Sequence, residues 1–227
     1  MLISIIMPVY NEERYIGEII GRVLKTDIEK ELIIIDDFST DGTREILNKF
    51  NRHEGVNIIL HERNKGKGAA IRTGLREVSG DVVIIQDADL EYDPGEYHKL
   101  LEPIVDGRAD AVFGSRFLGG PHRVLFFWHY IGNKVLTLLS NILSNLNLTD
   151  METGFKAFKA DVIKGMGLKS DRFGFEPEVT ARLARKRYRI YETPISYSGR
   201  SYAEGKKITW KDGLAAIIHI IRFNLLG

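Results

Sequence analysis

The sequence predicts an α/β fold in which a mainly parallel sheet is flanked by helices. Four apolar runs, at 3–10, 31–37, 57–61 and 81–89, are rich in β-branched residues and end in polar residues. The runs are continuous rather than alternating, which is typical of strands buried on both faces of a sheet. Helical candidates separate them, and strand–helix–strand alternation with right-handed crossovers gives an open parallel sheet.

Three helices are expected between these strands. The first begins at Asn11, a good N-cap that two glutamates follow in the first turn. The second begins at Asp41, and the third follows the glycines Gly66 and Gly68. Ligands of such sheets bind beyond the carboxyl ends of the strands, so the polar residues at those ends are the candidates for function.

The second half of the chain is less regular. We expect three further strands, at 111–117, 154–159 and 188–197. We expect three helices, at 125–146, 175–187 and 210–226. The first and the last of these helices carry an apolar stripe along one side and are therefore amphipathic.

Composition and charge exclude several classes of protein. The 227 residues suit one large domain and include no cysteine, which rules out disulfide scaffolds, thiolate zinc sites and a cysteine nucleophile. Residues 1–150 carry a net charge of −6, which disfavours nucleic-acid binding, and residues 151–227 carry +7. A basic end suits phosphates or an anionic membrane. No apolar run approaches the roughly 18 residues of a membrane span, so we expect a cytoplasmic protein, soluble or lying on a membrane.

The carboxyl end of the strand at 81–89 is a candidate metal site. Asp87 and Asp89, with Glu91 two residues further on, provide the hard oxygen ligands that suit Mg²⁺ or Mn²⁺. The alternative is an Asp-rich turn without a metal. Asp37, at the end of the strand at 31–37, could accept a hydrogen bond from a base or ribose, or belong to a turn before a helix cap.

Several cations follow other strands or open a helix. Lys67 stands between two glycines at a helix start, where backbone N–H groups favour anions, although a flexible loop explains the glycines equally well. Arg116, Arg200, Lys206 and Lys207 could clamp phosphates, or belong to solvated loops. The basic run at 182–189 is either a solvated face or a surface for anionic lipid.

An ordered set of motifs carries a family resemblance. PVYNE, DDFSTDGT, NKGKGAA, DADLE and GSRF occur in that order, followed by METGFKAF, RFGFEPEV and PISYSGRSYAEGKK. The set, which covers about residues 2–212, resembles family 2 glycosyltransferases with the GT-A fold. Within the family it is similar to the branch of dolichol-phosphate mannosyltransferases and polyprenyl-phosphate glycosyltransferases. The resemblance implies a single Rossmann-like GT-A domain over 1–227, with a nucleotide-sugar half at 1–115 and an acceptor half at 116–227.

The resemblance also implies roles for matching residues. In the donor pocket it implies nucleotide contacts for Pro8, Tyr10, Glu12 and Asp37, and diphosphate contacts for Asp87 and for a lysine of the pair Lys206 and Lys207. Lys67, at the helix start, is a further candidate for binding the donor. It implies that Asp87, Asp89 and Glu91 hold the metal; the mannosyltransferases usually carry Gln at the place of Glu91. Arg116 would hold the acceptor phosphate, and Arg200 would neutralise the departing nucleotide diphosphate, so that Asp89, Arg116 and Arg200 form the catalytic set.

The implied reaction is an inverting transfer of mannose or glucose to a polyprenyl or dolichyl phosphate. GDP-mannose and UDP-glucose are both credible donors, and UDP-GlcNAc stays open. The first alternative is transfer to a glycan or protein hydroxyl, with Asp150 or Glu152 as general base. The second is a nucleotide-sugar-binding module without activity. We expect peripheral contact with the cytoplasmic face of the cell membrane through the amphipathic helices; alternatively these helices pack in the core or form a homodimer interface.

Overall fold

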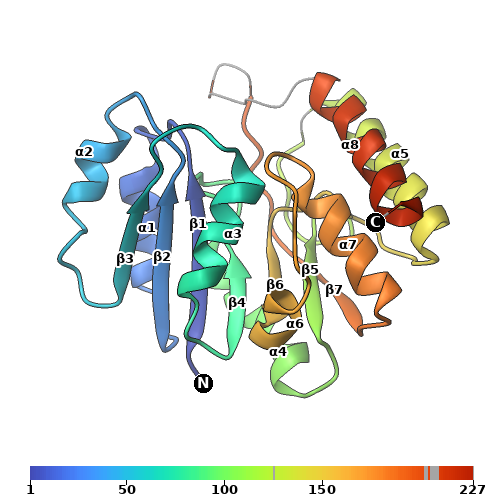
Figure 1. The fold of residues 1–227 in the computed structure, drawn as a ribbon, viewed down its shortest axis with the longest axis horizontal. Coiled ribbons are helices and arrows are strands. Elements are labelled where there is room, and N and C mark those ends of the chain that lie inside the picture. The colour runs from blue at the N-terminus through green and yellow to red at the C-terminus, as the bar shows by residue number, and fades with distance from the viewer. Residues whose placement is uncertain (125, 202–203, 205–209, 227) are drawn as a thin grey trace.

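The computed structural model describes residues 1–124, 126–201, 204 and 210–226, and its centre is a seven-stranded sheet. The strands are β1 (Ile3–Val9), β2 (Lys30–Asp36), β3 (Val56–Leu60), β4 (Val82–Ile85), β5 (Ala111–Ser115), β6 (Lys156–Lys159) and β7 (Ile190–Pro194). Their order in the sheet is β3-β2-β1-β4-β6-β5-β7 (Figure 1). β6 runs antiparallel to both of its neighbours, and the other pairs are parallel, so the predicted mainly parallel sheet is confirmed.

Helices cover both faces of the sheet. They are α1 (Ile16–Leu24), α2 (Thr43–Asn48), α3 (Lys67–Glu77), α4 (Tyr97–Val105), α5 (Phe127–Ser144), α6 (Ala160–Lys164), α7 (Phe175–Arg185) and α8 (Trp210–Leu225), with a 3₁₀ turn at Pro94–Glu96. One core cluster packs α1 and α4 against one face, and a second packs α3, α6 and α7 against the other. α5 and α8 lie side by side outside α7, at the edge of the molecule (Figure 1).

The start of the first helix is where the sequence prediction was wrong. Asn11 has a φ of 50°, in the left-handed region, and α1 begins only at Ile16. The Asn11 side chain accepts a hydrogen bond from the backbone N–H of Thr40 at 2.8 Å and so joins the loops after β1 and β2. The same short polar side chain that favours an N-cap can also stabilise a left-handed turn, and a long-range partner decides between them.

The strand order reverses between β1 and β4. Their pairing begins at Ile3 opposite Val82 and ends at Ile6 opposite Ile85, while β1 continues beside β2 as far as Val9. β1 and β4 therefore separate at their carboxyl ends. In open α/β sheets this switch point is where ligands bind.

Candidate active site

Arg200, from the loop after β7, lies among three carboxylates that follow β1 and β4. Its Nη2 donates to Asp89 Oδ2 at 2.6 Å, its Nη1 to Glu12 Oε2 at 3.1 Å, and its backbone N to Glu91 Oε1 at 3.0 Å. The Arg200 side chain is only 14% exposed, so these interactions are largely shielded from water. The structure thus brings together three of the predicted segments, which are far apart in the chain.

Lys67 joins the D-x-D segment to α7. Its Nζ lies 2.8 Å from Asp87 Oδ1 and 3.1 Å from Glu176 Oε1. Burial alone would lower the pKa of Lys67, but the two carboxylates outweigh burial and hold the pKa above its usual value. Gly154 lies close against this cluster, and a Cβ at that position would meet the Asp87 carboxylate and force it to shift.

The carboxylates of this cluster carry more negative charge than the nearby cations balance. Burial, followed by repulsion from Glu91 and Asp87, raises the pKa of Asp89 to about 8 even though Arg200 contacts it. In the described part of the chain no group of three or more His, Asp or Glu side chains is arranged to hold a metal ion. The side chains of Asp87, Asp89 and Glu91 nevertheless fit Mg²⁺ or Mn²⁺. Their carboxylate oxygens are hard ligands, and a divalent ion would balance the surplus negative charge.

Asp37, predicted to hold a base or ribose, is buried and hydrogen-bonded to other residues of the protein. It is 3% exposed, and His61 Nδ1 lies 2.8 Å from its Oδ1. The backbone N–H groups of Lys65 and Gly66 donate to its two oxygens at 2.8 and 2.6 Å. Asp37 therefore fixes the loop that leads into α3.

The start of α3, predicted as an anion site, also has its donors occupied. The backbone N–H groups of Gly68 and Ala69 donate to the carbonyls of Arg172 and Asp171. Lys67 is thus the polar group that this turn presents to the D-x-D segment. Of the other predicted nucleotide contacts, Pro8 is partly buried at the end of β1, and Tyr10 is exposed directly after it.

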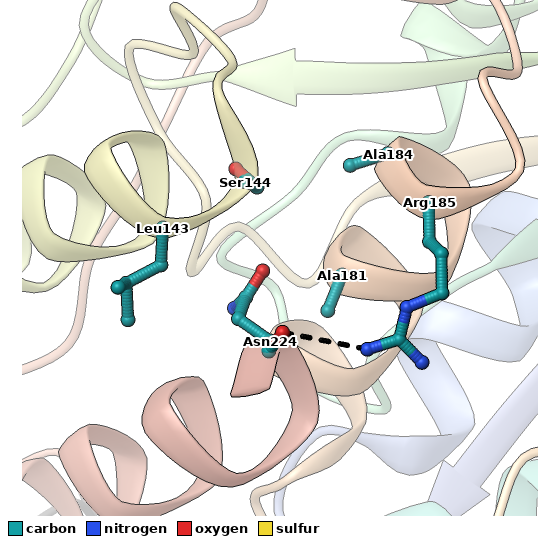
Figure 2. Close-up of a pocket in the computed structure, with 6 residues that line it drawn as sticks. All are labelled: Leu143, Ser144, Ala181, Ala184, Arg185 and Asn224. Atoms are coloured by element: carbon teal, nitrogen blue, oxygen red, sulfur yellow. Dashed lines mark hydrogen bonds between the residues drawn. The ribbon is translucent and has the colours of Figure 1, made fainter. Parts of the chain in front are cut away.

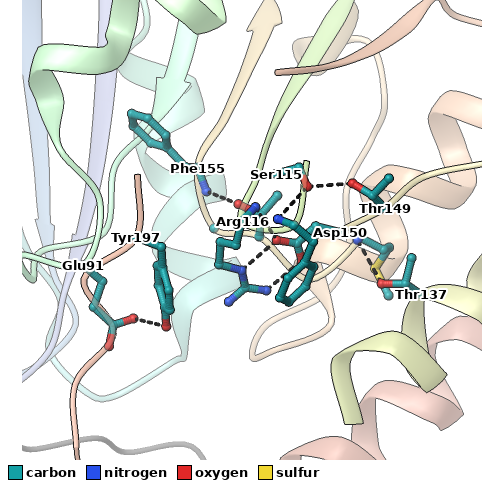
Figure 3. A network of polar contacts seen from close by, with 12 residues as sticks. Glu91, Ser115, Arg116, Thr137, Thr149, Asp150, Phe155 and Tyr197 are labelled. Carbon is teal, nitrogen blue, oxygen red and sulfur yellow. Dashed lines mark hydrogen bonds and ion pairs between the residues drawn. The ribbon is translucent and has the colours of Figure 1, made fainter. Parts of the chain in front are cut away.

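Arg116 and Asp150 form a buried ion pair at the carboxyl end of β5 (Figure 3). Arg116 Nε and Nη2 each donate to one Asp150 oxygen at 2.7 Å, and the backbone N of Arg116 donates at 3.0 Å. A bidentate pair of this kind fixes the guanidinium plane. Asp150, the candidate general base, is therefore the partner of Arg116, a relation that the two separate motifs do not reveal.

Tyr197 links this ion pair to the D-x-D side (Figure 3). Its hydroxyl donates to Glu91 Oε2 at 3.0 Å, and its ring centroid lies 5.2 Å from the guanidinium carbon of Arg116. The sequence analysis missed Tyr197 as a site residue. Its place three residues before the predicted phosphate-binding Arg200 was the available signal.

Glu152 and Lys156 both interact electrostatically with Glu176 and Asp150. Burial, and then repulsion from Glu176, raises the pKa of Glu152 to about 8, and its Oε1 has no hydrogen-bond partner among the described residues. Burial lowers the pKa of Lys156 to about 8, and its Nζ donates to the carbonyls of Met151, at 3.0 Å, and Thr153. Glu152 thus remains the second candidate base.

The basic run at 182–189 is largely engaged with the protein. Arg182 pairs with Glu178, and Arg189 pairs with Asp110. Arg185 donates to the carbonyl of Phe223 at 2.8 Å, at the end of α8. Arg185 also lines a pocket between the C-terminal ends of three helices, with Leu143, Ser144, Ala181, Ala184 and Asn224 (Figure 2). This pocket contains none of the predicted site residues.

Two apolar stripes are exposed on the outer helices. The α5 stripe consists of Val135, Leu138 and Ile142, and the α8 stripe of Leu214, Ile218, Ile221 and Leu225. Ile142 is 68% exposed, and Trp128, near the start of α5, is 78% exposed. Exposed apolar residues in such stripes indicate an interaction surface.

Two further findings concern the predictions for the C-terminal region. Among the described residues, no helix is both long enough and apolar enough to cross a membrane. Lys206 and Lys207, predicted to contact the donor diphosphate, lie outside the described residues.

Sequence comparison places the chain among named families. The model of the family described as Glycosyl transferase family 2 matches residues 4–167. An undecaprenyl-phosphate mannosyltransferase of Micrococcus luteus is 31% identical over 99% of this chain and 95% of its own length. A dolichol-phosphate mannosyltransferase of Pyrococcus furiosus is 29% identical over 91% of this chain, which spans 59% of that relative. A UDP-N-acetylglucosamine–dolichyl-phosphate N-acetylglucosaminyltransferase of Methanococcus voltae is 28% identical over 91% of this chain and 90% of its own length.

Solved structures share the fold. Glucosyl-3-phosphoglycerate synthase from Mycobacterium tuberculosis, in complex with Mn²⁺, UDP and glucosyl-3-phosphoglycerate, superimposes with a TM-score of 0.77. The identity is 20%, over 98% of this chain and 78% of that one. Together with the mainly parallel sheet, this likeness confirms the predicted GT-A fold.

Proposed function

The chain belongs to glycosyl transferase family 2, and from that premise we propose that it transfers a sugar, with inversion, from a nucleotide diphosphate sugar to a polyprenyl or dolichyl phosphate. The names of three similar proteins, two mannosyltransferases and an N-acetylglucosaminyltransferase, support this acceptor class. The sugar is mannose or glucose, carried by GDP or UDP.

The observation that carries the proposal is the pairing of Arg116 with Asp150. Transfer to an alcohol needs a base, which typically contributes 10²- to 10⁴-fold, whereas a lipid phosphate oxygen is already anionic near neutral pH. Both Asp150 oxygens accept from Arg116, so this carboxylate is occupied. The pairing fixes the Arg116 guanidinium, which is a group suited to phosphate.

On the donor side, Asp87, Asp89 and Glu91 would hold Mg²⁺ or Mn²⁺. The metal would neutralise the charge that develops on the leaving diphosphate. Arg200, together with Lys206 and Lys207, would balance the rest of that charge, and Lys67 would orient Asp87. Pro8, Tyr10 and Glu12 would line the nucleotide pocket, with Asp37 fixing its wall.

A lipid acceptor also requires access to a membrane. We assign residues 1–115 to the donor half and 116–227 to the acceptor half, whose exposed α5 and α8 stripes would bind the cytoplasmic face of the cell membrane peripherally. Exposed aromatic residues at the start of α5, on the Arg116 side, support this orientation. A homodimer through the same stripes is the competing assignment.

The test is transfer by the purified chain with Mg²⁺ or Mn²⁺ and each of three labelled donors, GDP-mannose, UDP-glucose and UDP-GlcNAc. Polyprenyl phosphate and the matching polyprenol are compared as acceptors, and label is counted in the organic phase. We expect label with the phosphate and none with the alcohol. Transfer to the alcohol, or no organic-phase product with any donor, would refute the proposal.

A further inference from the structure

We propose that Arg200 is an internal cation that occupies the metal ligands, and that the donor diphosphate frees these ligands by taking over the arginine. The inference rests on the proposed function and concerns the regulation of its donor side. Each of the three side-chain nitrogens of Arg200 donates to a different carboxylate. The partners are Asp89, Glu12 and Glu91, at 2.6, 3.1 and 3.3 Å.

Two of these partners, Asp89 and Glu91, are proposed metal ligands, and the protein already uses both oxygens of each. The second oxygen of Asp89 accepts from the backbone N–H of Glu91, and the second oxygen of Glu91 accepts from the Tyr197 hydroxyl, both at 3.0 Å. A carboxylate oxygen can take more than one partner, but a divalent ion on these oxygens would lie close to the guanidinium. Like charges that are near each other and shielded from water repel strongly. The metal can therefore bind Asp89 and Glu91 only when Arg200 leaves them.

Glu91 holds the segment that carries Arg200. Besides the bond from Nε, its carboxylate accepts from the backbone N–H of Arg200 at 3.0 Å, and its carbonyl accepts from the backbone N–H of Ser198 at 3.0 Å. With the bond from the Tyr197 hydroxyl, these contacts tie residues 197–200 to the residue two positions after the D-x-D pair. A carboxylate holds a guanidinium more strongly than a neutral side chain does. Glu91 is therefore a positioning residue that acts through Arg200.

A diphosphate can release Arg200 because it offers the same kind of partner. Its anionic oxygens suit the planar guanidinium as carboxylates do, and Mg²⁺ usually takes substrate phosphates among its ligands. When both arrive together, Arg200 exchanges the carboxylates for the diphosphate, and the metal replaces Arg200 on Asp89 and Glu91. A metal alone would meet the guanidinium, and a diphosphate alone would meet the carboxylates. Each ligand therefore raises the affinity of the protein for the other.

The competing explanation is that Arg200 is a permanent structural bridge between the loops after β1, β4 and β7. Arg200→Gln removes the charge, Arg200→Lys keeps the charge without the planar fork, and Glu91→Gln weakens the hold on Arg200. The matched control is Arg123→Gln. Arg123 contacts the same segment, through the carbonyl of Gly199 at 3.2 Å, and pairs with Glu204. Its described contacts include none of the proposed metal ligands.

The first measurement follows the Arg200 Nε–H signal of the full chain by heteronuclear NMR, with the signal identified by its loss in Arg200→Lys. We expect Mg²⁺ alone to leave the signal in place, and Mg²⁺ with GDP or with UDP to shift it. Exchange of this proton with water should be at least about tenfold faster in Glu91→Gln, the factor of a charged hydrogen bond. In Arg123→Gln the exchange should stay within about twofold of the wild type.

The second measurement is the affinity for Mn²⁺ without nucleotide, from the electron paramagnetic resonance signal of the free ion. Arg200→Gln should bind Mn²⁺ at least about tenfold more tightly than the wild type, within the usual range of coupling between sites. Arg200→Lys and Arg123→Gln should stay within about threefold of the wild type. Mn²⁺ should also raise the melting temperature of Arg200→Gln more than that of the wild type, because the ion binds the folded state.

The outcomes separate this inference from the proposed function. If the wild type glycosylates prenyl phosphate while Mg²⁺ with nucleotide leaves the Arg200 signal in place, the exchange is wrong and the proposed function stands. A shift with Mg²⁺ alone, or an unchanged Mn²⁺ affinity in a folded Arg200→Gln, would also overturn the exchange. If Arg200→Gln does not fold, the wild-type signal decides. If the signal shifts as expected but no prenyl phosphate is glycosylated, the exchange stands and the proposed acceptor class fails.

Discussion

The two sides of the site differ in how they hold charge. On the donor side, Lys67 and Arg200 contact five carboxylates, those of Glu12, Asp87, Asp89, Glu91 and Glu176. On the acceptor side, Arg116 and Lys134 contact one carboxylate, that of Asp150, and the rings of Phe117, Tyr130 and Tyr197. The first arrangement has surplus negative charge and the second does not.

This difference teaches which ligand each side accepts. Surplus carboxylate in a buried place is costly unless a cation joins it, and a divalent metal does so with the ligands it prefers. Cations held by aromatic rings keep their charge for an incoming anion, because a ring balances far less charge than a carboxylate. Under the proposed function, the donor side would therefore suit a metal and a diphosphate, and the acceptor side a phosphate without a metal.

The largest expected effect comes from breaking the donor side. Asp89→Asn should lower kcat/KM for the nucleotide sugar by at least about 100-fold, since it removes a proposed metal ligand and a partner of Arg200. Steady-state kinetics at several Mn²⁺ concentrations measure this effect, with circular dichroism as the control for folding. Full wild-type activity in excess EDTA would contradict the assignment of this side to a metal.

The next effect separates the two members of the acceptor-side pair. Arg116→Ala leaves Asp150 buried without its partner, so we expect a loss of about 3 kcal/mol in unfolding free energy and at least about 100-fold in acceptor kcat/KM. Asp150→Asn keeps the cation and should retain more than about a tenth of the activity. Urea unfolding and acceptor kinetics are measured for both variants. An inactive Asp150→Asn beside an active Arg116→Ala would indicate a hydroxyl acceptor and a base.

The two sides also differ in how far the sequence predicts them. Asp87, Asp89 and Glu91 follow the buried strand β4 within six residues, so their place at one edge of the sheet is readable from the apolar pattern. Arg200 was predicted as a phosphate-binding residue, but its contact with Asp89 joins residues 111 positions apart. No local pattern predicts such a contact, because it depends on how β7 packs in the finished sheet.

The contacts of Asp150 and Lys134 were the least predictable part of the acceptor side. Asp150 was a candidate base for a hydroxyl acceptor from its place before Thr153 and Gly154, whereas its partner in the structure, Arg116, is 34 positions away. Lys134 lies inside an amphipathic helix, where a lysine usually belongs to a solvated face. Its contacts with Phe117 and Thr149 arise only when α5 packs beside the end of β5. Lys206 and Lys207 remain predictions.

A smaller effect tests the group between the two sides, Glu152. Burial and Glu176 raise its folded-state pKa to about 8, from an unfolded value near 4.5. The folded state therefore binds the proton more tightly, and stability falls as pH rises from about 4.5 to 8. We expect the Glu152 contribution to unfolding free energy to be roughly 2 to 3 kcal/mol smaller at pH 7.5 than at pH 5.5. Glu152→Gln should remove this contribution and leave that of Asp89, whose pKa is also about 8 and which acts in the same direction.

Urea unfolding of both proteins without nucleotide measures the Glu152 effect. Lys156, whose pKa is lowered to about 8, changes the stability mainly above that pH, so the chosen window separates the two groups. Glu152→Gln should also keep most of its transfer to prenyl phosphate. A loss of transfer with an unchanged fold would make Glu152 the base for a hydroxyl acceptor.

The smallest effect on the protein itself concerns the apolar stripes. Leu138→Ser with Ile142→Ser removes the centre of the exposed α5 stripe, so the unfolding free energy should change by less than about 1 kcal/mol. Flotation with vesicles of anionic and neutral lipid at low salt should nevertheless show several-fold weaker binding, because the lost apolar area no longer enters the interface. The matched control is Leu60→Ser, an exposed leucine at the end of β3, on the far edge of the sheet, which should bind vesicles like the wild type. If the variant binds vesicles normally but changes from dimer to monomer in light scattering, the stripe is a homodimer interface, and the membrane contact must lie elsewhere on the acceptor side.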